Sequence, residues 1–445
     1  MRGGGGSLGA ALAAWLGAAL LVSGCWDRHE IETLGVATAV AFDLPASGEG
    51  IRMTALFAIP SRLGGGMGAG GGGGGGMTGA GSGPLAPFAR VSAGPIGPTA
   101  WVVGVQARTV SEAQEEMARL SPRLPFWAHV RLVVIGEELA RTGVARLLDP
   151  VVRDREFRIT PWVAVARDAP AYRLLELPSP LNTISSEGIV RLLQSESFQT
   201  ASVRAVRIRD VVIDLMEQGV EPVAPALSFE KPVPPDRTLV PSQEPGPPAF
   251  PVTRGTAVFR GDRLVGWLDP SETTALNLLR GESRPFTLTA RCPEGPGEAS
   301  VHFIRALVRR RLQEPGGNSP GQAQDRGRAV VVGAPPLPEI LLDISAEGSL
   351  RAANCQPPLG SAQRPKLEQE LARQLTHQLQ AVVDRLHREL RADAAGFGQM
   401  IARADPGRWE LLRPGWPELL PYLPVRIQMQ ARVRRTGLTN ARVDF

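Results

Sequence analysis

One segment of this chain has the spacing of a serine nucleophile. Residues 317–321 read Gly-Asn-Ser-Pro-Gly and match Gly-x-Ser-x-Gly. In that motif the backbone N–H after the serine stabilises the oxyanion. Here the next residue is Pro320, which has no N–H, and the segment lies in a Gly/Pro-rich stretch rather than at a strand-to-helix turn. We predict no catalytic residue here or elsewhere in the chain.

The five histidines are the natural candidates for metal ligands or general bases. His377 and His387 fall on one predicted helix, at a spacing that does not place both on the same face. His129 lies in an apolar strand, where a buried and hydrogen-bonded imidazole is the plainer interpretation. No Cys-x-x-Cys pair completes a ligand set. We therefore predict no metal site and no dissociable cofactor.

Cys25 is the cysteine whose neighbours do predict chemistry. It follows a short basic start, an apolar run over residues 8–22, and the small residues Ser23 and Gly24. This order is typical of a secretion signal, and the run is shorter than the roughly 20 residues of a spanning helix. The segment resembles a bacterial lipobox, cut between Gly24 and Cys25. We predict that residues 1–24 are a signal peptide. A covalent diacylglycerol on Cys25 would then hold the mature chain on a bilayer surface.

Cys292 and Cys355 are the remaining cysteines. Export permits a disulfide between them. Their separation in sequence does not show that their Cα atoms lie close enough for one. Two unpaired, buried cysteines are the alternative, and both interpretations stay open at this point.

The charge of the chain is modest and well mixed. Lys and Arg number 49 against 44 Asp and Glu, for a net charge of +5. No basic run is interleaved with aromatic residues as single-strand binding requires, so we predict no nucleic-acid partner. A mildly basic exterior would help an anchored protein to lie near anionic lipid.

The apolar patterning mixes strands and helices, which predicts an α+β fold. We expect three consecutive sheet-plus-helix domains. They are an N-terminal domain over 25–195 with a disordered Gly-rich loop at 64–84, a middle domain over 196–285 with a Pro-rich linker at 221–251, and a C-terminal domain over 286–445.

The C-terminal domain should contain the longest helix of the chain. Leucines recur at helical spacing from Leu367 to Leu390, and the helix is expected to run from Pro365 to about Ala394. We expect it to pack this stripe on an antiparallel sheet. Gly396 and Gly398 are interpreted as a helix C-cap that seats Phe397.

Motifs spread along the chain resemble those of the C-subunit lipoproteins of spore germinant receptors, the Ger(x)C or GerAC family. They are Gly24–Arg28, Ala107–Ala113, Phe126–Val130, Leu148–Pro150, Arg158–Trp162, Gly255–Phe259, Leu264–Leu268, Asp393–Gly398, Trp409, Trp416 and Arg434–Gly437. Each motif alone is modest, and their shared order is specific.

The resemblance implies a non-catalytic α+β protein anchored on the outer face of the spore inner membrane. It further implies integral-membrane A and B receptor subunits as partners. The complex would respond to small nutrient germinants, and the residues that would contact a germinant are unknown. The alternative is a solute-binding lipoprotein of a transporter. That class is disfavoured because regular βαβ alternation is missing from the second half of the chain.

Overall fold

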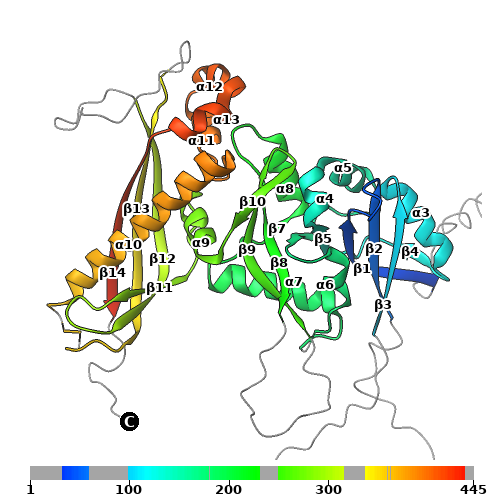
Figure 1. Cartoon of the computed structure of the whole chain (residues 1–445), viewed down its shortest axis with the longest axis horizontal. Helices are drawn as coiled ribbons and strands as arrows, with labels where there is room; N and C mark the ends of the chain where they lie inside the picture. Colours follow the sequence, from blue (N-terminus) through cyan, green and yellow to red (C-terminus); the bar gives the residue numbers. More distant parts are fainter. Residues whose placement is uncertain are drawn as a thin grey trace, which may run out of the picture.

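The computed structural model describes residues 33–59, 99–179, 181–230, 249–314, 336–357, 359–360 and 362–435. The predicted signal peptide, Cys25, the Gly-rich loop and the Gly-x-Ser-x-Gly segment lie outside these residues. Within them the chain forms two sheets, which stand side by side along the long axis of the molecule (Figure 1).

Parallel strands form the centre of the first sheet. In spatial order these strands are β8 (Val223–Glu230), β6 (Trp162–Ala166), β5 (Leu132–Gly136) and β1 (Leu34–Asp43). Strands β5 and β6 read LVVIG and WVAVA. Such continuous apolar runs are typical of parallel strands that are covered on both faces.

Antiparallel strands extend this sheet on both sides. Next to β1 lie β2 (Ile51–Ala58) and β3 (Ala100–Ala107), and next to β8 lie β9 (Phe250–Arg260) and β10 (Arg263–Leu268). Short strands β4 (Leu124–Phe126) and β7 (Val206–Arg207) pair with β1 and β6. Strand β10 is therefore an edge strand of this sheet, and it lies on the side nearer the second sheet (Figure 1).

Helices cover both faces of the first sheet. One core contains apolar side chains of α3 (Val110–Leu120), α4 (Glu137–Thr142), α5 (Ala145–Arg153) and α8 (Ile208–Met216). The core on the other face contains those of α6 (Ala171–Glu176) and α7 (Ser185–Gln199). The resulting unit has three layers.

The structure differs from the predicted division at residue 196. Strands from the predicted N-terminal and middle domains share the first sheet, and the expected boundary falls inside α7. The start of the Pro-rich segment is the buried strand β8. Pro225, which has no N–H, is tolerated because the register shifts between Pro225 and Leu227.

The second sheet carries the long helix. It has the order β11 (Phe286–Arg291), β12 (Glu298–Gln313), β13 (Glu339–Ala353) and β14 (Val425–Arg435). Helix α10 (Arg364–Asp384) packs its leucine stripe into the core of this unit, as predicted. Helix α9 (Pro270–Leu279) lies between the two sheets (Figure 1).

The second sheet is mixed rather than antiparallel. Strands β11, β12 and β13 pair antiparallel, whereas β14 pairs parallel with β13. The reason is the connection, because α10, α11 (Phe397–Ala404), α12 (Pro406–Leu412) and α13 (Trp416–Leu419) form a crossover between β13 and β14. Short 3₁₀ turns at Arg413–Gly415 and Leu420–Tyr422 complete it.

The long helix ends differently from the prediction. After α10 the chain makes one π-helical turn, Arg385–Leu390, and Arg391 then takes a left-handed conformation with φ 48°. Gly396, with φ 69°, begins α11. The predicted role of Gly396 and Gly398 as a C-cap of the long helix is therefore wrong.

Cys292 and Cys355 form a disulfide, with their Cα atoms 5.6 Å apart. Cys292 follows β11 and Cys355 follows β13, so the bond joins the ends of two strands of the second sheet. It closes a sequence separation of 63 residues. In the chain-entropy account, a loop of that length stabilises a fold by about 4 kcal/mol.

Candidate functional site

The two sheets meet at a polar contact that we call the junction. It consists of the segment 214–221 from the first unit, the segment 393–409 from the second, and the side chains of Arg280 and Arg310. In Figure 1 it lies where the end of α8 approaches α11.

The centre of the junction is a contact between two glycines. The Gly219 carbonyl accepts a hydrogen bond of 2.7 Å from the Gln399 N–H. Gly219 has φ 73°, and a Cβ placed on it would lie 2.3 Å from the Gly398 carbonyl carbon. A Cβ on Gly398 would likewise lie 2.8 Å from the Gly219 Cα. The two backbones therefore touch, and neither position has room for a side chain.

Asp393 organises the second unit's half of the junction. Its side chain is 2% exposed and accepts hydrogen bonds from the N–H groups of Phe397 (2.9 Å) and Gly398 (2.6 Å). These are free donors at the start of α11, which a carboxylate satisfies. The Trp416 indole N–H also donates to it at 3.2 Å. Burial raises the pKa of Asp393, while these three hydrogen bonds act in the opposite direction.

Two half-buried arginines join the chain segments of the junction. Arg280 donates to the Ala394 carbonyl at 2.5 Å and to the Glu221 carbonyl at 2.9 Å, and pairs with Asp214 at 3.3 Å. Arg310 donates to the carbonyls of Ala395 (3.0 Å) and Gly396 (3.1 Å). The planar guanidinium fork allows one side chain to satisfy several carbonyls at once.

Aromatic side chains surround the glycine contact. Trp409 packs against Gly398 and donates from its indole N–H to the Gln218 side chain at 2.9 Å. The rings of Trp409 and Trp416 meet edge-on at 5.2 Å. Phe397 is fully buried and contacts the His387 ring at 5.6 Å. Burial lowers the pKa of His387 to about 4, which keeps the imidazole neutral at physiological pH.

The polar groups of the junction hold the two units together. Its carboxylate and guanidinium groups are bonded to backbone groups or to each other, so none is directed at an open cavity. Across the described ranges, no cluster of three His, Cys, Asp or Glu side chains could hold a metal ion. The arrangement fixes the orientation of one sheet unit against the other.

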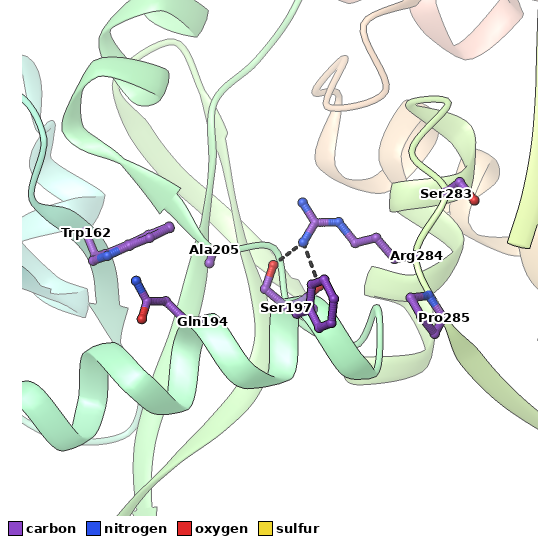
Figure 2. Close-up of a pocket in the computed structure, with 8 residues that line it drawn as sticks. Trp162, Gln194, Ser197, Ala205, Ser283, Arg284 and Pro285 are labelled. Atoms are coloured by element: carbon purple, nitrogen blue, oxygen red, sulfur yellow. Dashed lines mark hydrogen bonds between the residues drawn. The ribbon is translucent and has the colours of Figure 1, made fainter. Parts of the chain in front are cut away.

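A surface hollow of about 560 Å³ lies between α7 and the segment that leads to β11. Figure 2 shows Trp162, Gln194, Arg284 and Pro285 on its walls. The guanidinium of Arg284 is already bonded to Ser197 and to Glu282. Arg284, the cation that would recognise an anionic ligand here, is therefore already bonded within the protein.

The residues singled out from sequence fall in different places. Cys25 and Gly24 lie outside the described residues, and the Cys292–Cys355 disulfide is in the second sheet. The Asp393–Gly398 motif, Trp409 and Trp416 do lie together at the junction. Sequence reasoning missed Gly219, Arg280 and Arg310. A glycine after a helical pattern indicates a chain reversal, so the sequence did contain a signal for Gly219. No sequence pattern indicated the two arginines.

Two family models match the chain, and the second match begins within β9, inside the first sheet rather than between the two sheets. Residues 27–229 match the family described as Spore germination protein N-terminal domain. Residues 254–437 match the family described as Spore germination B3/GerAC like, C-terminal. The chain therefore belongs to the GerAC family of spore germination proteins, which confirms the expected family. The junction joins these two matched regions.

Individual relatives cover almost the whole chain. Spore germination protein KC of Bacillus subtilis (strain 168) is 24% identical over 432 residues, which is 95% of this chain and 94% of that protein. Spore germination protein YndF of the same strain is 21% identical over 451 residues, covering 94% of each. A crystal structure of the GerBC protein has a TM-score of 0.51 at 14% identity and covers 89% of this chain and 96% of that one. The similarity to GerBC confirms the expected α+β fold class.

Replacement of Gly219 by alanine tests the glycine contact. The new Cβ would enter the Gly398 backbone, so Gly219→Ala should lower the free energy of unfolding by about 3 kcal/mol or more. Gly48→Ala is the matched control, since Gly48 has φ 76° with nothing within 4 Å of its added Cβ. The control should cost only the left-handed strain of about 1–2 kcal/mol. Equal losses in urea unfolding would show that the contact contributes nothing.

Glu221 gives the junction a predicted pH dependence. Burial, chiefly, and the nearby Asp393 and Asp214 raise its pKa to about 7, against the effects of Arg260 and of a hydrogen bond from the Gly261 N–H. The folded chain thus holds this proton more tightly than the unfolded chain. Stability contributed by the protonated form is lost as the pH rises through the folded pKa.

We expect Glu221→Gln to remove this dependence. From about pH 5 to about pH 8, the parent should lose about 1–3 kcal/mol more unfolding free energy than the variant. Denaturant titrations of both proteins across this range provide the measurement. Parallel pH profiles would contradict the assignment.

Proposed function

We propose that this chain is the C subunit of a spore germinant receptor, anchored to a membrane by lipid and acting without catalysis. The observation that carries the proposal is the match to both GerAC regions in order, over 27–229 and 254–437. Relatives named as spore germination proteins extend along nearly the full length of the chain. The proposed partners are integral-membrane A and B subunits, and a small nutrient germinant would act through the complex.

Two features support attachment at an outer membrane face, here the outer face of the spore inner membrane. The first is the lipobox-like Ser23-Gly24-Cys25 after an apolar run. The second is the Cys292–Cys355 disulfide, a bond that persists in oxidising compartments. Among the described residues, no helix is long and apolar enough to cross a bilayer. A diacylglycerol on Cys25 supplies the two acyl chains that stable anchoring takes.

The junction supports a receptor subunit over the alternative, a solute-binding lipoprotein of a transporter. A solute-binding clamp keeps a ligand cleft between two lobes that open and close. Here the contact between the units is closed by the backbones of Gly219 and Gly398 and by the carbonyls bonded to Arg280 and Arg310. A rigid body that presents its outer surface to other subunits agrees better with this arrangement.

Replacement of Cys25 tests the anchor and the role together. Cys25→Ala should release the protein from the salt-washed spore membrane fraction and should abolish nutrient-triggered germination as fully as deletion of the gene does. Mass spectrometry of the parent should find Cys25 at the N-terminus with an attached diacylglycerol. Detergent extracts of the parent should contain the two integral-membrane subunits with this chain.

The double variant Cys292→Ala, Cys355→Ala is the control for thiol loss. It removes the other two cysteines and should stay in the membrane fraction, because it keeps the lipobox. A parent that retains residues 1–24 and carries no fatty acid would rule out the anchor. A lipidated parent that extracts without membrane subunits would rule out the receptor role alone.

A further inference from the structure

Among the described residues, α10 covers one face of the second sheet and none covers the other. Along β12, β13 and β14 the residues that pack with α10 alternate with residues that are half-buried or exposed. We define the open face by six arginines on the uncovered side: Arg305, Arg309, Arg311, Arg426, Arg432 and Arg434.

The strand register places these arginines on both sides of a central strand. Arg305 lies opposite Glu347 of β13, and Glu347 lies opposite Arg432 of β14. Four residues further along β12, Arg309 lies opposite Asp343 of β13. Since neighbouring strands are about 4.8 Å apart, the two lines of guanidinium groups stand about 10 Å apart across the face. The face is therefore an array of cations with carboxylates along its middle.

The arginines outnumber the carboxylates that could neutralise them. Asp343 pairs with Arg311, Glu339 pairs with Arg426 at 3.1 Å, and Glu347 pairs with Arg434 at 2.6 Å. Within the described part of the chain, no ion pair or hydrogen bond is made by the side chains of the other three arginines, Arg305, Arg309 and Arg432. Their guanidinium groups are exposed to solvent and carry the excess positive charge.

Aliphatic side chains stand among these cations. Leu307 lies on the open face between Arg305 and Arg309 and is 47% exposed. Ile304, at the register shift of β12, is 61% exposed. A surface that binds this face must therefore accept both cations and apolar side chains. A lipid interface accepts both, because apolar groups enter the acyl boundary while guanidinium groups stay among the phosphates.

We infer that the open face binds the anionic headgroups of a phospholipid bilayer. A guanidinium group forms two parallel hydrogen bonds with a phosphate, and the array presents several such groups on one side of the molecule. Each cation near an anionic membrane raises the partition coefficient about fivefold. Three unpaired arginines therefore give weak, reversible and salt-sensitive attachment.

Binding of the open face to lipid does not depend on the proposed function. Only the consequence of that binding in the cell rests on it. Figure 1 shows the second sheet at the opposite end of the molecule from β1, the strand that follows the predicted anchor. A lipid on Cys25 would hold the open face at a high effective concentration near the bilayer, so that weak binding suffices. Attachment at both ends would lay the body along the membrane.

Vesicle sedimentation of a chain without lipid tests the open face separately from the anchor. The protein is residues 25–445 with Cys25→Ser. The vesicles are phosphatidylcholine alone, or equal parts of phosphatidylcholine and phosphatidylglycerol. The protein should sediment with the mixed vesicles only, and less so as salt is raised. The triple variant Arg305→Gln, Arg309→Gln, Arg432→Gln should lower the partition coefficient by at least about tenfold.

A matched variant removes the same charge elsewhere. Arg146, Arg155 and Arg158 are exposed, belong to the first unit, and are changed together to glutamine. This control should keep at least half of the parent's binding, and circular dichroism should show all three proteins folded.

Three results would overturn the inference. They are equal loss in the two triple variants, equal binding to neutral vesicles, or binding that the open-face variant retains. Binding to a polyglutamate peptide but not to vesicles, lost in the open-face variant, would assign the face to an acidic protein instead. An unlipidated Cys25 in the native protein would leave these vesicle results unchanged, so the two proposals fail separately.

Discussion

The structure depends on a contact between two backbones, at Gly219 and Gly398. These two segments of the chain approach each other so closely that neither glycine has room for a side chain. The groups around the contact serve this approach, because Asp393 satisfies the first N–H groups of α11, and Arg280 and Arg310 satisfy the carbonyls before it. Burying these backbone groups without partners would cost more than the contact returns. The glycines and the polar side chains therefore act together to hold the two sheet units as a single body.

The proposed role, in which the chain presents its surfaces to other subunits, agrees with a junction of this kind. The buried ionisable groups of the junction hold chain segments in place, and the arginine beside the surface hollow is paired within the protein. What remains available to a partner is the exterior of a long, fixed body. In the proposed receptor, such a body can report contact at one end as a displacement at the other, because its parts do not swing independently.

The sequence predicted what short-range patterns encode. The α+β patterning and the leucine stripe of α10 follow from periodicity. The common sheet of residues 34–268, the parallel pairing of β14 and the partners of Arg280 could not be predicted. They join residues far apart in the chain, and one sequence has no signal for which distant segments meet. Gly396 was interpreted as the end of a helix because the π-helical turn before it left no mark in the pattern.

The most direct test of the central claim is hydrogen exchange at the Gln399 and Glu221 amides. The Gln399 N–H donates to the backbone carbonyl of Gly219, and the Glu221 N–H donates to the backbone carbonyl of Asp393. Both hydrogen bonds therefore cross the junction. If the two units form one body, both amides should exchange with an opening free energy close to that of the core strands β5 and β13. Fast exchange at both amides, while the two strands stay protected, would show units that separate in the native state and would contradict the account.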